Sequence, residues 1–573
     1  MRRLFALLLL LAAGGVGLWW WLHGSQGPKG PSITARAAQD VPAAAPRLSQ
    51  KLIASEDLPP AGTRSLFDHL VAQGDGLPYP FEKLVALIQK QDPEGRAPVT
   101  LMIPSGRSLL KAQADFHHPR VLVAADFQAP GTPASLGLAP RGQLFLGFVE
   151  NANEIEVLSY NEAAGRYEFQ LVQDYSAHGA RRIVYARRAV CTTCHQGGSP
   201  IFPQRPWNET NGQPQIAAKI VAARGAEPYL ATPPAQPLAA PERFDELTDI
   251  GGFVTVTQQL WIDACARDNE CRRLMLKLAL RYLADPGSFD EAGADAQQLR
   301  QLQAAAWPQG GIAVPQSDLP NRDPLAEKQG LRGRLRSLFE AQPEPGTAPK
   351  SNEDLVAFDR LPKLPATLDP LTSRPPKRLL TAQDIDGIYG LAALFTEGDR
   401  QRLEQAAGYQ QAAVEQAVDR LDAALLAPTP FSRVKILQAL LPLLDGKAMP
   451  AYCCLDTKEM SPPQASGVPP LKLAADSPLR PFETHCFSCH RGNPAKRLDF
   501  MGGKSEAEVL EQVKATTKIR DALDWERYRG TDKQNTLMPP ADSPQHAALV
   551  EALKQDPQLL EKMRAVVPGL FDF

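Results

Sequence analysis

Cys486-Phe-Ser-Cys-His490 repeats, late in the chain, the pattern of Cys191-Thr-Thr-Cys-His195. A Cys-x-x-Cys-His run is the attachment sequence of a c-type haem, because its two thiols form thioethers with the porphyrin and the adjacent His becomes an iron ligand. The repeat therefore predicts two covalently bound haem c groups. The attachment residues are Cys191, Cys194, Cys486 and Cys489, and the iron ligands are His195 and His490.

Two other interpretations use the same thiols and explain the pattern less well. Structural zinc pairs normally lie about 15 to 20 residues apart, whereas most of the chain separates these two pairs. A thioredoxin-like redox pair does not need a His directly after its second Cys, and both copies have one. The sequence thus favours haem over zinc or dithiol chemistry.

The region after the second motif carries features of a small helical domain. Ser505 to Glu508 form a capping box that opens an amphipathic helix. Leu537-Met-Pro-Pro540 follows, and a last helix is expected to begin near Pro544. Over about residues 481–558 this order resembles a class I cytochrome c domain. The resemblance implies an all-α domain over 451–573 in which Met538 supplies the sixth iron ligand, with Met501 as the rival candidate.

The region around the first motif, residues 61–225, predicts an α+β domain. Four short runs rich in aromatic and β-branched residues indicate an antiparallel meander: 143–150, 154–160, 166–174 and 182–187. Ile201, Phe202 and Trp207 follow His195 and form either an apolar wall for the porphyrin or ordinary core. From Tyr79 to Trp207 the sequence resembles uncharacterised bacterial haem proteins.

The sixth position of the first iron has no equivalent of the Met-Pro-Pro sequence. The next methionine downstream of His195 is Met275. Candidates upstream are Met102, His117, His118 and His178, and an open position is the remaining alternative. An open position would let peroxide or dioxygen bind, as in bacterial di-haem peroxidases and rubber-cleaving di-haem oxygenases.

The middle of the chain, residues 226–450, predicts helices separated by Pro-rich linkers. Apolar residues recur at helical spacing over 257–283, 400–426 and 432–441, with Pro442 and Gly446 as stop signals after the last run. We expect these helices to dock the two haem regions against each other. The predicted fold is thus mainly α, with a small antiparallel β meander in the amino-terminal haem domain (α+β) and an all-α carboxy-terminal domain.

The amino terminus indicates a membrane anchor over 1–23. Arg2 and Arg3 precede an uncharged run from Leu4 to Leu22 that is long enough, as a helix, to cross a bilayer. A cleaved signal sequence is the alternative, although the nearest Ala-x-Ala lies well beyond the apolar run. A Pro/Gly/Ala-rich tether follows over 24–60. The body of the protein is then expected in the periplasm, anchored to the inner membrane or soluble if the segment is cleaved.

Charge and the remaining cysteines add further expectations. The 573 residues include 62 Lys and Arg against 64 Asp and Glu, which predicts no nucleic-acid partner. Cys265 and Cys271 could form a short-loop disulfide in an oxidising compartment. The pairing of Cys453 and Cys454 is left open. Arg491, Lys496 and Arg497 are either propionate partners or solvated basic residues.

These features predict a membrane, periplasmic, metal-binding haem and iron protein of electron transport. Met/His ligation of the second iron leaves no open coordination site, which favours transfer of electrons between redox partners: a partner protein or a quinol/oxidase system. The alternative is a haem oxidoreductase, peroxidase- or oxygenase-like, with the first haem as the reactive site and the second as relay. A haem-based sensor is a third class, and the chain shows no signalling motif for it.

Overall fold

The fold comes from a computed structural model of the chain. It describes residue 51 and residues 56–567, except for 73–75, 93–94, 105–113, 127–140, 193, 204–206, 237–238, 317, 320–375, 383–386, 409, 448–456, 458–459, 467–470, 493–498, 532–535 and 541–542. The predicted anchor over 1–23 and most of the tether lie outside these residues, as do Cys453, Cys454, Lys496 and Arg497.

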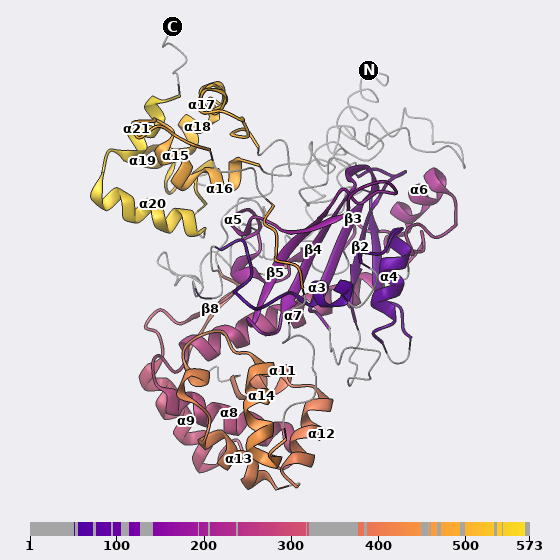
Figure 1. Ribbon diagram of the computed structural model, residues 1–573, viewed down its shortest axis with the longest axis vertical. Coiled ribbons are helices and arrows are strands. Elements are labelled where there is room, and N and C mark those ends of the chain that lie inside the picture. Colours follow the sequence, from indigo (N-terminus) through magenta and orange to yellow (C-terminus); the bar gives the residue numbers. More distant parts are fainter. Residues whose placement is uncertain are drawn as a thin grey trace, which may run out of the picture. The chain divides into compact units, whose positions relative to one another are not determined.

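A six-stranded antiparallel sheet forms the centre of the amino-terminal region (Figure 1). Each strand pairs with the next along the chain: β1 Val99–Ile103, β2 Arg120–Ala124, β3 Leu144–Val149, β4 Glu154–Asn161, β5 Arg166–Gln173 and β6 Arg182–Tyr185. The predicted meander is therefore confirmed as β3 to β6. Sequence analysis missed β1 and β2, because short apolar runs without alternation cannot be told from buried helix.

The two faces of the sheet have different covers. On one face Met102 of β1 belongs to a core with α3 Leu66–Ala72, α4 Phe81–Gln89 and α6 Pro214–Arg224. On the other face the neighbouring Leu101 packs in a core with the long helix α7 Ala239–Asp263. Successive strand residues point to opposite faces, so each strand contributes to both cores.

The middle helices share a further core, separate from the two that cover the sheet. They are α8 Asn269–Ala284, α9 Ala294–Ala306, α11 Gly387–Leu394, α12 Glu397–Ala406, α13 Gln411–Asp419 and α14 Arg433–Asp445, with the 3-10 turn η8 Ala423–Leu426. A disulfide between Cys265 and Cys271 joins the end of α7 to α8, as the sequence had suggested.

Helix boundaries in this region differ from the predicted ones. The run over 257–283 is divided between α7 and α8, because Asp268 accepts hydrogen bonds from Glu270 and Cys271 and starts a new helix. The run over 400–426 is divided into α12, α13 and η8. Helix α14 passes through Pro442 and ends at Asp445, directly before its capping residue Gly446. A proline in the final turn removes only one helical hydrogen bond, whereas Gly446 has a φ of 73°, which glycine adopts readily.

The carboxy-terminal region is all-α, as predicted, with its own apolar core. It consists of α15 Arg480–His485, α16 Phe487–His490, α17 Glu506–Ala515, α18 Lys518–Ala522, α19 Trp525–Tyr528, α20 Pro544–Gln555 and α21 Leu559–Ala565 (Figure 1). Ser505 caps α17 by accepting a hydrogen bond from Glu508, while the Glu508 carboxylate accepts one from Lys504. Helix α20 begins at the predicted Pro544, but α21 follows it.

Short elements complete the description and include the first motif. They are η2 Glu150–Ala152, α5 Arg188–Cys191, η3 Gln196–Gly198, the parallel pair β7 Phe202–Pro203 with β9 Asp318–Leu319, and the antiparallel pair β8 Ile312–Val314 with β10 Arg378–Leu380. Within the described ranges, every helix is too short or too polar to span a bilayer. No described helix therefore supports the predicted transmembrane helix, whose residues 4–22 lie outside these ranges.

Candidate functional site

The two Cys-x-x-Cys-His motifs adopt the same backbone turn. In the first, the carbonyl of Cys191 accepts hydrogen bonds from the N–H groups of Cys194 at 3.1 Å and His195 at 2.9 Å. In the second, the carbonyl of Cys486 accepts them from Cys489 at 3.1 Å and His490 at 2.9 Å. One turn of backbone thus carries the two cysteines and the His of each motif, and all four cysteines lie outside the disulfide that joins Cys265 to Cys271.

The His195 ring is oriented by the loop that follows it. Its Nδ1 lies 2.7 Å from the carbonyl oxygen of Ser199. A carbonyl can only accept, so Nδ1 carries the proton and Nε2 keeps a lone pair. Gly197 and Gly198 make this approach possible because both have positive φ values, 62° and 76°. A metal-ligating His commonly donates its other N–H to a backbone carbonyl, and the donor set here fits that arrangement.

Beneath the first motif lies a buried ion network that the sequence did not reveal. Arg188 is fully buried and donates hydrogen bonds to Glu168 at 3.1 Å and to the carbonyl of Tyr167. Arg166 pairs with the same Glu168 carboxylate at 2.7 Å. Burial lowers the pKa of Arg188 to about 10, while Glu168 opposes that shift. The network fixes the start of α5, the short helix whose last residue is Cys191.

The ring of Phe169 contacts His195 edge to face, with 5.3 Å between centroids. Phe169 is in β5, and the Arg188 guanidinium lies 5.4 Å from its ring centre. Phe202 and Trp207 of the predicted wall pack on Phe244 of α7, at 4.7 and 5.9 Å between centroids. Cys191 packs against the same apolar cluster, so these contacts are compatible with both interpretations offered by the sequence.

The second motif lies in the helical core. Cys486 and Phe487 are buried with Met501 and Phe482 in the carboxy-terminal apolar cluster. The His490 and Phe500 rings are tilted by 33° with 4.2 Å between their centroids, and the His490 carbonyl accepts a hydrogen bond from the Met501 N–H. The surroundings of this turn are therefore apolar and helical, whereas those of the first are charged and sheet-based.

Met538 is held in a fixed loop through its backbone. Its N–H donates to the carbonyl of Ala522 at 2.8 Å, and its carbonyl accepts from the indole N–H of Trp525 at 3.0 Å. His546 stacks on Trp525 at 4.7 Å, and its Nδ1 lies 3.0 Å from the carbonyl of Pro539. The Met538 side chain is half-buried and lies outside the apolar cluster, so it is available as a ligand.

The other methionines singled out by the sequence are core residues. Met501 is 1 % exposed in the carboxy-terminal cluster. Met102 belongs to the sheet face opposite to the one on which Cys191 packs. Met275 lies in the core of the middle helices, where the Gln303 amide contacts its sulfur at 3.5 Å. Packing therefore accounts for all three.

The three histidine candidates are not in the core. His178 is exposed in the turn after β5. His117 and His118 are half-buried neighbours whose ring centres lie 6.5 Å apart. His118 contacts Asp115, and the carbonyl of His117 accepts a hydrogen bond from Arg224.

Burial raises the pKa of three motif thiols. It raises the pKa of Cys486 to about 12 and that of Cys489 to about 11, and it raises the pKa of Cys191 as well. The S–H form that this favours is the form that adds across a porphyrin vinyl.

The general prediction of a metal-binding protein is corrected by the same surroundings. In the described part of the chain, no group of three or more His, Cys, Asp or Glu side chains could hold a metal ion. Protein side chains alone therefore do not form a metal site at either motif.

The two motifs contact each other directly. Arg187, the residue before α5, donates from Nη1 to the carbonyl of Phe487 at 2.8 Å and to that of Ser488 at 3.4 Å, both within the second motif. Sequence analysis expected the middle helices to bring the haem regions together. The contact observed here joins the two regions without an intervening helix.

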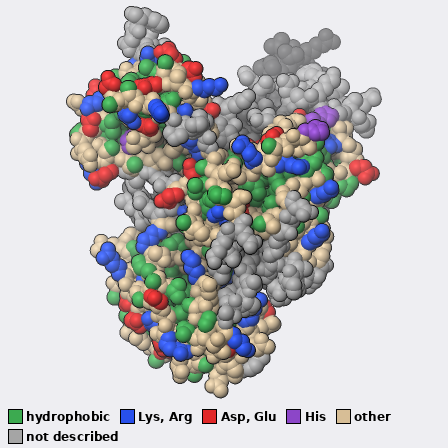
Figure 2. Space-filling view, in the orientation of Figure 1, with side chains coloured by type: hydrophobic (Ala, Val, Ile, Leu, Met, Phe, Trp, Pro, Cys, Tyr) green, Lys and Arg blue, Asp and Glu red, His purple; other side chains and the backbone are tan. Residues whose placement is uncertain are grey.

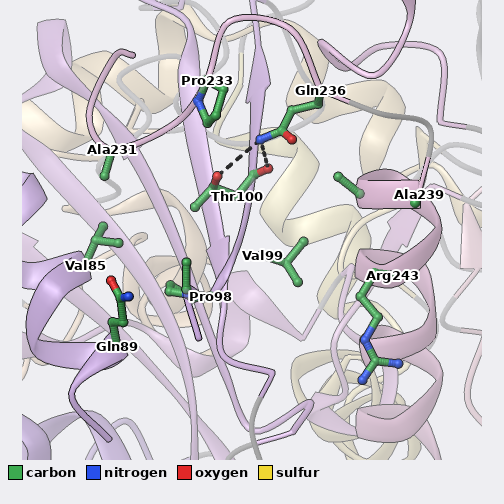
Figure 3. A pocket seen from close by; sticks show the side chains of 12 residues that line it. Val85, Gln89, Pro98, Val99, Thr100, Ala231, Pro233, Gln236, Ala239 and Arg243 are labelled. Atoms are coloured by element: carbon green, nitrogen blue, oxygen red, sulfur yellow. Dashed lines mark hydrogen bonds between the residues drawn. The ribbon is translucent and has the colours of Figure 1, made fainter. Parts of the chain in front are cut away.

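A pocket of about 510 Å³ lies between β1, α4 and α7 (Figure 3). Gln236 donates from Nε2 to the carbonyl of Thr100 at 3.1 Å across its rim. Arg243 is also at the rim and pairs with Asp126 and Glu246. The described residues that line the pocket include no Cys, His, Asp or Glu and none of the predicted site residues. The pocket therefore gives no support to the predicted haem sites.

The visible face of the molecule mixes basic and acidic side chains (Figure 2). This agrees with the nearly balanced 62 basic and 64 acidic residues. No protein-family model matches the chain, nor does any curated protein or any solved structure.

Proposed function

We propose that this protein binds two haem c groups covalently and transfers electrons between redox partners. The observation that carries the proposal is that two distant pentapeptides fold into the same turn, each with two cysteines that lie outside the Cys265–Cys271 disulfide and a His directly after them. In each turn, two S–H groups would add across the two vinyl groups of one porphyrin, with no net oxidation. When bound, the haem groups supply reversible one-electron chemistry at iron.

The chain's own residues would orient both ligands. The Ser199 carbonyl holds the Nδ1 proton of His195, which directs Nε2 away from the loop. The tilted Phe500 ring, 4.2 Å away between centroids, limits rotation of His490. Elsewhere in the same region, Ala522 and Trp525 hold the backbone of Met538, the residue that would supply the sixth ligand. Ligation by Met and His would suit electron transfer, since small ligands would find no open position.

The disulfide between Cys265 and Cys271 supports placing the protein in an oxidising compartment. Covalent haem attachment takes place in such a compartment. We therefore propose a location outside the cytoplasm, with a protein or quinol/oxidase system as redox partner.

The haem content of purified full-length protein tests this proposal. Pyridine haemochrome analysis should give two haems per chain, and one after either C191A/C194A or C486A/C489A. The double variant C265A/C271A is the matched control, because it removes two cysteines outside the motifs and should keep both haems. A content below two in the unaltered protein would refute the proposal.

Carbon monoxide distinguishes electron transfer from the oxidoreductase alternative. Two six-coordinate low-spin haems should leave the spectrum of the reduced protein unchanged under carbon monoxide. A fraction that binds carbon monoxide and disappears in C191A/C194A would instead identify the first haem as a reactive site.

A further inference from the structure

The backbone at Arg187 is fixed by the first motif. Arg187 follows β6 and precedes α5, and its carbonyl accepts hydrogen bonds from Val190 at 3.0 Å and Cys191 at 3.4 Å. The next residue, Arg188, donates its N–H to the Asp57 carboxylate at 2.9 Å, while its guanidinium is held by Glu168. The base of the Arg187 side chain is therefore rigidly attached to the turn that carries Cys191.

The tip of the same side chain is fixed by the second motif. Its Nη1 donates to the carbonyls of Phe487 and Ser488, at 2.8 and 3.4 Å. These two residues separate Cys486 from Cys489, so the guanidinium lies against the peptide groups between the two attachment sulfurs. One half-buried side chain thus links the two turns.

A second set of bonds brings the chain to this contact. Tyr185, at the end of β6, donates its N–H to the carbonyl of Gln464 and accepts from the N–H of Ser466, both at 2.7 Å. The segment around Ala465 thereby pairs parallel to β6 as an additional short strand. This pairing fixes the chain before the carboxy-terminal region, while Arg187 contacts the second turn itself.

We propose that Arg187 is a positioning residue that makes the two haem groups one coupled pair. This inference rests on the proposed function. Thioether bonds would tie each porphyrin to its turn, so the geometry between the turns sets the geometry between the haems. Electron tunnelling weakens steeply with distance. An electron delivered to one haem would therefore pass on to the other, which leaves the first oxidised again and the second reduced. A redox partner would then need access to only one haem.

The charge of Arg187 has a separate effect. A positive charge near an iron favours its reduced, less positive state, and a half-buried position weakens solvent screening. The nearby Asp57 carboxylate, whose pKa is raised by burial, offsets part of this charge. Position and charge can be separated experimentally, because Lys keeps the charge but cannot donate to two carbonyls with a rigid fork.

The test uses the full-length holoprotein and the variants R187Q and R187K. The matched control is R182Q, since Arg182 is an exposed arginine of β6 whose side chain donates a hydrogen bond to Gln173 at 3.4 Å. Haem content is measured first. EPR spectra of the fully oxidised proteins then report the spin–spin interaction between the two ferric irons, and a redox titration reports the potential of each.

Unaltered protein and R182Q should show two haems and the same spin–spin interaction. R187Q should keep both haems, lose the interaction and show a lower potential for the second haem. R187K should keep the potential but show a weakened interaction, and it decides the question if R187Q fails to retain both haems. Two haems without any interaction in the unaltered protein would overturn the inference alone, as would an interaction unchanged in both Arg187 variants. Fewer than two haems in the unaltered protein would overturn the proposed function itself.

Discussion

The two Cys-x-x-Cys-His turns have the same backbone and unlike surroundings. Around the first, a buried Arg188 pairs with Glu168, and the His195 ring donates to a loop carbonyl. Around the second, an apolar cluster encloses Cys486, and the His490 ring packs against the tilted Phe500 ring. The comparison teaches that five residues fix a local turn, while the neighbouring chain decides how that turn is stabilised. We expect the two regions to respond differently to equivalent substitutions.

The largest difference should appear when a cation is removed from each region. Arg188→Met leaves the buried Glu168 with Arg166 as its remaining ion-pair partner, so the free energy of unfolding should fall by about 3 kcal/mol or more. In the second region Lys514 pairs with Glu511 on the surface of α17, with side chains 41 % and 72 % exposed. Lys514→Met should cost about 0.5 kcal/mol or less. Urea unfolding measures both, and equal losses would remove the distinction.

Two methionines of the second region should separate packing from ligation. Met501→Ala opens a cavity in the apolar cluster and should lower the free energy of unfolding by about 2 to 5 kcal/mol, with the second haem still six-coordinate. Met538→Ala removes a half-buried side chain, so its cost in stability should be smaller. It should lower the potential of the second haem, on the order of 100 mV, because Met ligation raises it. The reverse assignment of effects would make Met501 the ligand.

A pH dependence should belong to the core of the first region. His69 is buried in α3, its Nε2 has no hydrogen-bond partner among the described residues, and burial lowers its pKa to about 4. The unfolded chain takes up this proton near pH 6.5, before the folded one does. Stability is therefore greatest above pH 6.5 and falls as the pH drops toward 4.

The expected loss between pH 8 and pH 5 is about 2 kcal/mol for this group. Urea unfolding of the unaltered protein and of His69→Gln at both pH values isolates it, since the variant lacks the titrating ring. If both proteins lose the same stability on acidification, His69 is not responsible.

The smallest effect concerns glycines with positive φ. Gly198 has a φ of 76°, and an added Cβ would lie 3.3 Å from Nη2 of Arg188. Gly530 in the second region has a φ of 77° and open space around it. Both Gly→Ala changes should cost about 1 to 2 kcal/mol. Only Gly198→Ala should also alter the visible spectrum of the first haem, because it disturbs the turn that holds His195. A spectrum unchanged in both variants would mean that this turn does not orient the ring.

Local sequence was sufficient to predict the elements that depend only on neighbouring residues. The aromatic and β-branched runs over 143–187 predicted β3 to β6, and Ser505 and Pro544 predicted the starts of α17 and α20. The two pentapeptides predicted paired thiols with an adjacent His, because that turn needs only hydrogen bonds between neighbouring residues. Strands β1 and β2 escaped, since their apolar runs carry no periodic signal.

Only the tertiary structure decided what surrounds the turns. No spacing in the sequence indicates that Arg188 reaches Glu168, that Phe169 meets His195, or that Arg187 reaches the peptide groups of the second motif. Such contacts depend on how separate segments pack, and they join residues as far apart as 187 and 487. The sequence by itself determined the chemistry that each motif can perform. Folding determined that the motifs meet, because burying the sheet and the helical cores leaves the two turns in contact through one arginine.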